Sequence, residues 1–138
     1  MNAAATDTLS VLIVDDSSVV RRRLSALVAE DGRLRVVAEA SGALEGLYGF
    51  KTHQPDAVVL DLQMPGLNGV ELLRRIKLTA PRCVVIVLTN YPPAAVREEC
   101  ERSGADYFLH KATEFERVVV ILGALARTRR PAVGRSAP

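Results

Sequence analysis

Residues whose side chains could do chemistry stand at the ends of four apolar runs of this chain: Asp15 and Asp16, Asp61, Thr89 and Lys111. The runs are continuous and rich in β-branched residues, a pattern typical of strands buried on both faces of a parallel sheet. A charged group is costly inside such a strand, so we expect these residues to emerge at the carboxyl ends of their strands. In open α/β sheets ligands bind at that edge.

Three carboxylates that meet at one edge of a sheet repel one another, and a hard divalent cation relieves that repulsion. Mg²⁺ prefers oxygen ligands and usually combines one or two carboxylates with phosphate oxygens. The Lys111 ammonium and the Thr89 hydroxyl would meet the oxygens of a phosphoryl group, whose transfer depends mainly on positioning and charge stabilisation. Asp61 follows the central strand and is the candidate nucleophile, which would form an aspartyl phosphate. The alternative is that these polar residues only cap the turns after the strands.

Five strands and five helices are predicted to alternate along the chain and to position these residues. The strands are expected at residues 9–14, 34–39, 57–60, 83–88 and 105–109. No two of them are close enough in sequence to form a hairpin, so each must be joined to the next by a crossover helix. Such crossovers are right-handed. The sequence therefore predicts one α/β domain with a parallel sheet and helices on both faces.

Helix starts and apolar stripes define the five predicted helices. Residues typical of helix starts are Ser17, Ser41, Asn68, Pro93, and Thr113 with Glu116, the last pair having the spacing of a capping box. Apolar residues at helical spacing are expected to face the core, among them Val20, Leu24, Leu27, Val28, Leu44, Leu47, Phe50, Val70, Leu73, Ile76, Phe115, Val118, Val119, Leu122 and Leu125. Arg21, Arg22 and Arg23 are expected on a solvated outer face.

Composition argues against several classes of function. The 138 residues include 18 Lys and Arg against 16 Asp and Glu, a net charge of +2, which does not indicate a nucleic-acid or membrane surface. Cys83 and Cys100 do not form a CxxC metal motif, and we expect reduced thiols. The N-terminus has no signal-peptide pattern and no apolar run is long enough to cross a bilayer, so we expect a cytoplasmic protein without a membrane or nucleic-acid partner.

Four segments, in order, resemble the receiver domain of response regulators in two-component signalling. They are VLIVDDSSVVRRRL, VVLDLQMPGLNGVELL, VIVLTN and GADYFLHKATEF, and together they cover about residues 9–127. The resemblance implies a flavodoxin-like, doubly wound (βα)5 fold with a five-stranded parallel sheet in the order 2-1-3-4-5. We expect a disordered lead-in over residues 1–8, the receiver domain over 9–127, and a flexible basic tail over 128–138.

The resemblance also implies a chemistry for the polar residues. Asp61 would accept a phosphoryl group from a phosphohistidine on a sensor histidine kinase or a phosphotransfer protein. Thr89 and Lys111 would bind oxygens of that phosphoryl group. Mg²⁺ would be held by Asp15, Asp16, Asp61 and the backbone carbonyl of Gln63.

Several positions near the site depart from the family pattern or vary within it. Asn90 stands where the residue after the threonine is usually Ala or Gly, so we expect slow phosphorylation by small donors and slow hydrolysis. Ala112 follows Lys111 where proline is common, so no cis peptide bond is expected there. Gln63 and Tyr91 are positions at which the family tunes the lifetime of the phosphoryl group.

The same resemblance implies how a signal would leave the site. Phe108, three residues before the lysine, is the aromatic expected to turn inward when Thr89 moves. The neighbouring Tyr107 faces the other side of the strand and is the less favoured alternative. The face formed by the fourth helix, the fifth strand and the last helix would bind a partner. On the last helix, Val120 and Ala124 lie opposite the core stripe.

Only eleven residues follow Arg127, so we expect a stand-alone switch without an output domain that binds a downstream protein or dimerises. It would not be an enzyme beyond its own phosphoryl transfer and slow autodephosphorylation. The alternatives are a phosphorelay intermediate that passes phosphate to a phosphotransfer protein, a small phosphohydrolase with an Asp nucleophile, and a flavin-binding domain. Gln63 stands where such a hydrolase has a second Asp, and Asp15-Asp16 where a flavin-binding domain has a phosphate loop, so both fit poorly.

Overall fold

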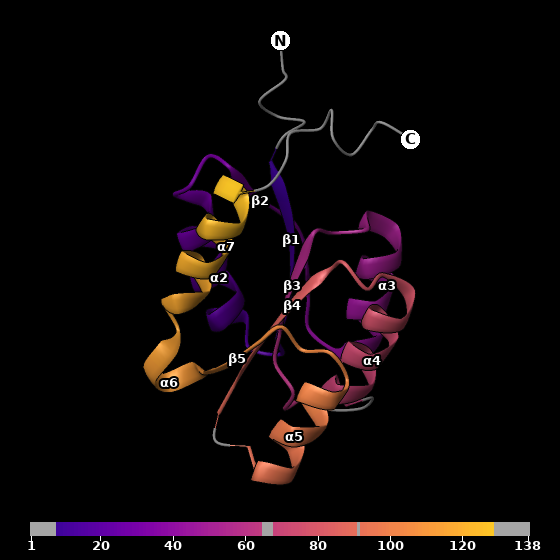
Figure 1. The fold of residues 1–138 in the computed structure, drawn as a ribbon. Coiled ribbons are helices and arrows are strands. Elements are labelled where there is room, and N and C mark those ends of the chain that lie inside the picture. The colour runs from indigo at the N-terminus through magenta and orange to yellow at the C-terminus, as the bar shows by residue number, and fades with distance from the viewer. Residues whose placement is uncertain (1–7, 65–67, 91, 129–138) are drawn as a thin grey trace.

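Five parallel strands form one sheet in the order β2-β1-β3-β4-β5 (Figure 1). The structure is a computed structural model, and it describes residues 8–64, 68–90 and 92–128. The strands are β1 (Leu9–Val14), β2 (Leu34–Ala40), β3 (Ala57–Leu60), β4 (Val84–Thr89) and β5 (Tyr107–His110). The predicted flavodoxin-like strand order and the parallel pairing are confirmed.

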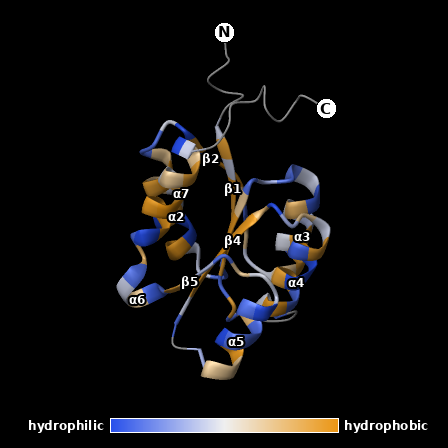
Figure 2. Ribbon diagram, in the orientation of Figure 1, coloured by the Kyte–Doolittle hydropathy of each residue, from blue (hydrophilic) through white to orange (hydrophobic). Residues whose placement is uncertain are grey.

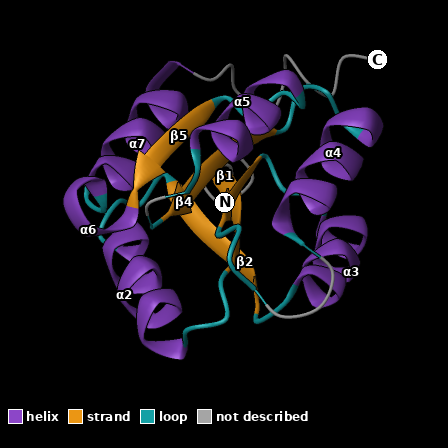
Figure 3. Ribbon diagram, turned by 90° about the horizontal axis from the view of Figure 1, so that it is seen from below, coloured by secondary structure: helices purple, strands orange, loops and turns teal. Residues whose placement is uncertain are grey.

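Helices cover both faces of this sheet. They are α2 (Ser18–Ala29), α3 (Ala43–His53), α4 (Gly69–Thr79), α5 (Ala94–Arg102), α6 (Lys111–Glu114) and α7 (Arg117–Thr128). Viewed along the strands, α2 and α7 lie on one face, and α3, α4 and α5 lie on the other (Figure 3). No helix among the described residues is long and apolar enough to cross a membrane.

The strands alternate their side chains between two apolar cores, one on each face. Leu12, Val58 and Val85 pack toward α3 and α4. The next residue along each strand packs toward α2 and α7 in the second core: Ile13, Val59 and Ile86. Figure 2 draws β1 and β4 as hydrophobic segments between the two helical layers. Burial on both faces explains why these strands read as continuous apolar runs in the sequence.

Both cysteines are free, buried thiols among these apolar side chains. Burial raises the pKa of Cys83 to about 12. Burial also raises the pKa of Cys100 to about 11, helped by the charges of Glu99 and Glu101. Neither thiol is therefore an effective nucleophile at neutral pH.

The predicted start of α3 was wrong in two respects. Gly42, and not Ser41, is the N-cap residue, while the amide and hydroxyl of Ser41 both donate to the Glu45 carboxylate. Leu44 was expected in the core and is exposed. A Cβ at Gly46 would lie 2.9 Å from Leu72, so the glycine side of α3 is the side that approaches the core, and Leu44 is turned outward.

The capping box predicted for the last helix was also wrong. Thr113 lies inside the short helix α6, and Glu116 lies in the turn before α7. Glu114, and not Glu116, provides the carboxylate that accepts a hydrogen bond from a preceding backbone amide, that of His110, at 2.9 Å. Phe115 is buried in the core at the break between the two helices. Burying this ring divides one predicted helix into two.

Candidate functional site

The strand register brings the polar residues to one edge of the sheet. Val14 of β1 pairs with Leu60 of β3, so Asp15 and Asp61, one residue further along each strand, emerge level with each other. Thr89 pairs with His110 in the same way, which places Lys111 just beyond the threonine. Figure 3 views the molecule from this end of the sheet.

Three carboxylates meet at this edge: Asp15, Asp16 and Asp61 can each direct one oxygen so that all three lie within 4.8 Å of one another. Asp15 and Asp61 are buried, at 2% and 3% exposed, whereas Asp16 is exposed. The convergence predicted from the sequence is therefore present. The exposed carboxylate of Asp16 leaves the cluster open to solvent on one side.

Lys111 pairs with the two buried carboxylates. Its Nζ lies 2.7 Å from Oδ2 of Asp15 and 3.1 Å from Oδ2 of Asp61. Burial lowers the pKa of this ammonium, but its hydrogen bond to Asp15 and the charge of Asp61 outweigh that effect and raise the pKa above its ordinary value. The lysine is therefore fully charged at neutral pH.

Asp61 is engaged at both carboxylate oxygens. Its Oδ1 accepts hydrogen bonds from the Thr89 hydroxyl at 3.0 Å and from the Gln63 amide at 3.1 Å. Its Oδ2 accepts from Lys111. Thr89 is wholly buried, so its hydroxyl has a fixed place beside the carboxylate. These donors fix the orientation of the Asp61 carboxylate.

The loop between β1 and α2 is held by local hydrogen bonds. The Ser17 amide donates to Asp15 Oδ1 at 2.9 Å, and the Ser17 hydroxyl caps α2 by accepting from the Val20 amide at 3.2 Å. Burial raises the pKa of the Asp15 carboxyl, although the hydrogen bonds from Lys111 and Ser17 act against that rise. The buried cluster thus carries more negative charge than its environment favours.

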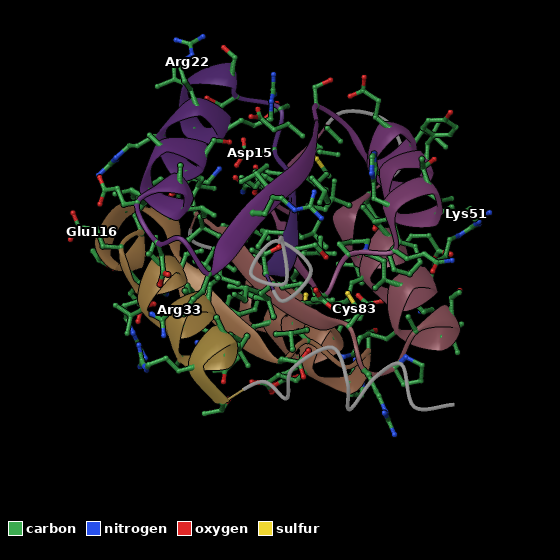
Figure 4. The ribbon with its side chains drawn as sticks, turned by 90° about the horizontal axis from the view of Figure 1, so that it is seen from above. Asp15, Arg22, Arg33, Lys51, Cys83 and Glu116 are labelled. Atoms are coloured by element: carbon green, nitrogen blue, oxygen red, sulfur yellow. The ribbon has the colours of Figure 1, made fainter. Side chains whose placement is uncertain are left out.

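Arg21 takes part in this loop, a role that the helical pattern did not predict. Its guanidinium donates to the Asp15 carbonyl at 2.7 Å and forms an ion pair of 3.3 Å with Glu39, which also accepts from Ser25. Its side chain is only 19% exposed, so the predicted solvated face was wrong for this residue. Arg22, in contrast, projects outward from α2 (Figure 4). Arg23 lies over the Phe115 ring, 4.1 Å from its centre.

The donor set fits Mg²⁺. Three carboxylate oxygens within reach of one another, one of them from an exposed residue, suit a hard cation that keeps several water ligands. Lys111 leaves negative charge in the cluster because it is one ammonium among three carboxylates. The backbone carbonyl of Gln63 as a further ligand stays a prediction.

A side-chain bridge spans the loops beside Asp61. The Gln63 amide nitrogen donates to the Asn90 carbonyl at 3.3 Å, which ties the loop after β3 to the loop after β4. A cavity of about 320 Å³ lies next to this bridge, between α4 and α5, and Thr89 lines it. Tyr91 lies outside the described residues. No cis peptide bond occurs in the described parts of the chain, so the Lys111–Ala112 bond is trans as expected.

The two aromatic residues of β5 differ in their surroundings. Phe108 is half-buried against the core on the α5 side, with the Arg97 guanidinium 5.0 Å from its ring centre. Tyr107 is 40% exposed. Their opposite directions agree with the alternation of a strand. Which ring responds to the site stays a prediction.

Comparison with known proteins gives consistent results. The sequence model of the response regulator receiver domain matches residues 11–122. An uncharacterised response regulatory protein of Vibrio cholerae is 38% identical over 120 residues, which cover 86% of this chain and 49% of that protein. A protein-glutamate methylesterase/protein-glutamine glutaminase of Nitratidesulfovibrio vulgaris is 39% identical over 101 residues, 72% of this chain and 28% of that protein. The chain thus spans about half the length of these curated relatives, or less.

A solved structure agrees with the fold. The response regulator domain of Thermotoga maritima CheB superposes with a TM-score of 0.75 at 31% identity, covering 87% of this chain and 94% of that one. The strand order, the acidic edge and the sequence match point to the same family. The chain belongs to the response regulator receiver domain family of two-component signalling.

Proposed function

We propose that this chain is a phosphorylation-activated switch and that Asp61 is its phosphoacceptor. The observation that carries the proposal is the arrangement around that carboxylate: Lys111 and Thr89 donate to it, and Asp15 and Asp16 lie beside it. A charged nucleophile among preorganised donors is what phosphoryl transfer requires. We place the receiver domain at residues 9–127 and the protein in the cytoplasm.

The proposed reaction moves a phosphoryl group from a histidine to an aspartate. An Asp61 oxygen attacks the phosphorus of a phosphohistidine on a histidine kinase or a phosphotransfer protein. The new O–P bond forms as the P–N bond breaks, and the imidazole nitrogen keeps the electron pair of that bond. Asp15, Asp16 and Asp61, with the Gln63 carbonyl, would hold Mg²⁺, which supplies positive charge to the phosphoryl oxygens when bound.

The side chains around Asp61 would then change partners. Thr89 and Lys111 now donate to the carboxylate, and each would donate instead to a phosphoryl oxygen. Movement of the buried threonine changes the packing behind it, and Phe108 is the ring that we propose responds. The altered α5–β5–α7 face, where Tyr107 and Val120 are exposed, would bind a downstream protein or a second copy.

Transfer from a radiolabelled phosphohistidine kinase domain in the presence of Mg²⁺ tests the proposal. Wild-type protein is expected to take up one phosphoryl group per chain, and Asp61→Asn is expected to take up none. Asp56→Asn is the matched control, because Asp56 lies at the other end of the same strand, bound to Ser10, and its variant should label as wild type does.

Three other results would contradict the proposed switch. Labelling of Asp61→Asn to the wild-type extent would remove Asp61 as the acceptor. Many turnovers of a small phosphoester would indicate a phosphohydrolase. Complete loss of the label to an added histidine phosphotransfer protein, with no change in the α5–β5–α7 face by NMR, would indicate a relay intermediate.

A further inference from the structure

A second surface with the features of a binding site lies between α3 and α4, away from the acidic edge. On α3, Leu44, Leu47, Tyr48 and Lys51 follow the i, i+3, i+4, i+7 spacing that places residues on one helix face. Leu44 is 70% exposed and Tyr48 is 74% exposed. This stripe is apolar over its first two turns and ends in a positive charge.

The facing side of α4 continues the surface. Leu78 is 77% exposed, and it lines a hollow of about 170 Å³ together with Leu47 and Lys51 of α3 and Arg75 of α4. The two helices pack against each other and lie side by side (Figure 3). We call this hollow and its continuation the α3–α4 groove.

The groove continues past the ends of both helices. A larger hollow of about 480 Å³ shares Lys51 and Thr79 with the first, and its lining includes Phe50, Pro55 and Arg82. A volume of this size is within the range of ligand-binding clefts. Phe50 and Pro55 are buried beneath it, so its floor is apolar. An extended occupant could therefore contact both hollows.

The charges around the α3–α4 groove are predominantly positive. Within the part of the chain that the structure describes, Lys51 and Arg82 form no ion pair, and Lys51 extends outward from α3 (Figure 4). The acids nearby are already engaged: Glu71 pairs with Arg74 and Arg75. Asp56, which also lines the larger hollow, accepts two hydrogen bonds from Ser10. The unpaired cations leave the groove suited to carboxylates.

The apolar exposure is also concentrated here. The large hydrophobic side chains most exposed in the described residues are Val19, Leu44, Tyr48, Leu78, Tyr107 and Val120. Three of these six belong to the two helices of the groove: Leu78 of α4 lines its smaller hollow, and Leu44 and Tyr48 lie on α3. Clustered exposed apolar residues with a polar rim are typical of protein interaction sites.

We propose that the α3–α4 groove binds an acidic amphipathic helix of a partner protein. Leu47 of α3 and Leu78 of α4 line the smaller hollow and would accept the apolar face of a helix. The exposed Leu44 and Tyr48 would extend that contact along α3, and Lys51 and Arg82 would accept the carboxylates of the bound helix. The exposed face of α3 is 11 residues long, about 16 Å at 1.5 Å per residue, which matches three turns of a bound helix. The site is concave, which favours a helix over a flat membrane surface. This binding does not depend on phosphorylation of Asp61.

A synthetic peptide is the probe for this proposal. It has leucines at i, i+3, i+4 and i+7 over three turns and glutamates on its remaining face, and its binding to the full chain is followed by NMR. We expect saturable shifts on α3 and α4. Leu44→Gln combined with Leu78→Gln is expected to weaken binding about tenfold, the scale on which central apolar contacts act. Lys51→Glu should weaken it as well.

Matched controls distinguish specific binding in the α3–α4 groove from nonspecific binding to exposed apolar side chains. Val19→Gln removes a similarly exposed valine on α2, outside both proposed binding surfaces, and should leave the peptide affinity unchanged. A peptide with lysines in place of the glutamates should bind at least about tenfold more weakly to wild-type protein. Four outcomes would each overturn the proposal. Three of them concern the peptides: no saturable binding, equal binding of both peptides, and shifts confined to α5–β5–α7. The fourth outcome is stronger binding of the protein to anionic phosphatidylglycerol vesicles than to the peptide.

Discussion

Both ends of the sheet carry carboxylates paired with a lysine, but the ratio of carboxylates to ammonium groups differs between them. At the carboxyl end, three carboxylates lie close together, and the ammonium of Lys111 pairs with two of them, Asp15 and Asp61. At the amino end, Lys77 lies 2.9 Å from Asp106, and Asp106 also accepts from the Val85 amide at 2.8 Å. Lys77 donates further to the carbonyls of Pro81 and Cys83.

This difference distinguishes an ion pair that holds two elements together from a charged cluster that can bind a ligand. At the amino end Lys77 pairs with Asp106, and the amide and hydroxyl of Ser10 donate to Asp56; the ion pair joins α4 to the start of β5. At the carboxyl end negative charge is in surplus, and burial of Asp15 raises the pKa of its carboxyl. A surplus of negative charge that the protein does not neutralise can attract an external cation.

Replacing Lys111, and for comparison Lys77, is expected to give the largest change in the free energy of unfolding. Lys111→Met should lower the free energy of unfolding by about 3 kcal/mol, because buried carboxylates lose their cation. Mg²⁺ should restore most of that loss, so its stabilising effect is expected to exceed that in wild type. Lys77→Met should also be destabilising, but with the same Mg²⁺ effect as wild type. Urea unfolding with and without saturating Mg²⁺ measures both, and equal Mg²⁺ effects in the two variants would remove the distinction between the ends.

Neutralising one acid at each end is expected to change stability in opposite directions. Asp15→Asn should raise the unfolding midpoint at pH 7. The pKa of Asp15 is raised on folding from its ordinary value of 3.8, so the folded state disfavours the charged carboxylate above that pH. The gain should shrink as the pH falls and disappear well below 3.8, where the carboxyl is protonated in both states.

The matched change at the other end is Asp106→Asn. It should lower stability by about 1 kcal/mol, the upper end of the scale for a partly exposed ion pair, because Lys77 loses its partner. Urea unfolding across pH, without Mg²⁺, compares the two variants. Destabilisation by Asp15→Asn at pH 7 would show that its charge is not in surplus.

Access to the acidic edge is the next point to test. Asn90 follows Thr89 directly in the chain, is exposed, and accepts a hydrogen bond from the Gln63 side chain at its carbonyl. Asn90→Ala keeps that carbonyl and removes only the side chain, so phosphorylation by acetyl phosphate and hydrolysis should both become about fivefold faster, equivalent to about 1 kcal/mol. Thr79→Ala, at the amino end, is the control and should leave both rates unchanged. Unchanged rates in Asn90→Ala would mean that this side chain does not limit access.

The smallest expected effect concerns the loop that presents Asp16. Arg21→Ala removes the hydrogen bond to the Asp15 carbonyl and should weaken Mg²⁺ binding about threefold, below the tenfold scale of groups that bond a ligand directly. Arg22→Ala removes a neighbouring arginine that points to solvent and should have no effect. Titration calorimetry with Mg²⁺ measures both affinities. An equal loss in the two variants would indicate a general effect of positive charge.

Strands and their polar ends could be predicted from the sequence because both depend on local pattern. A strand buried on both faces must be apolar throughout, so β1 and β3 begin and end where the apolar runs do. Once the strands are parallel, the position of Asp61 beside Asp15 and Lys111 follows from topology. Whether Mg²⁺ and a phosphoryl group bind there is a matter of chemistry that the fold alone does not decide.

The errors arose where tertiary packing decides between equivalent local patterns. Leucines at helical spacing predict a buried face, but in α3 the glycines allow the closest approach to the core, and Leu44 is exposed as a result. Thr113 and Glu116 have capping-box spacing, yet burial of Phe115 breaks the helix between them. Arg21 reaches back to the preceding loop, a contact that helical periodicity cannot indicate.

The position of β3 has a consequence for hydrogen exchange. All four of its residues are buried, and it is bonded to β1 on one side and β4 on the other. Amides in such a strand exchange with solvent only when the whole domain unfolds. Asp61 is therefore attached to a segment that is expected to stay closed until the domain unfolds, so any faster response to a change at this carboxylate must come from residues outside β3.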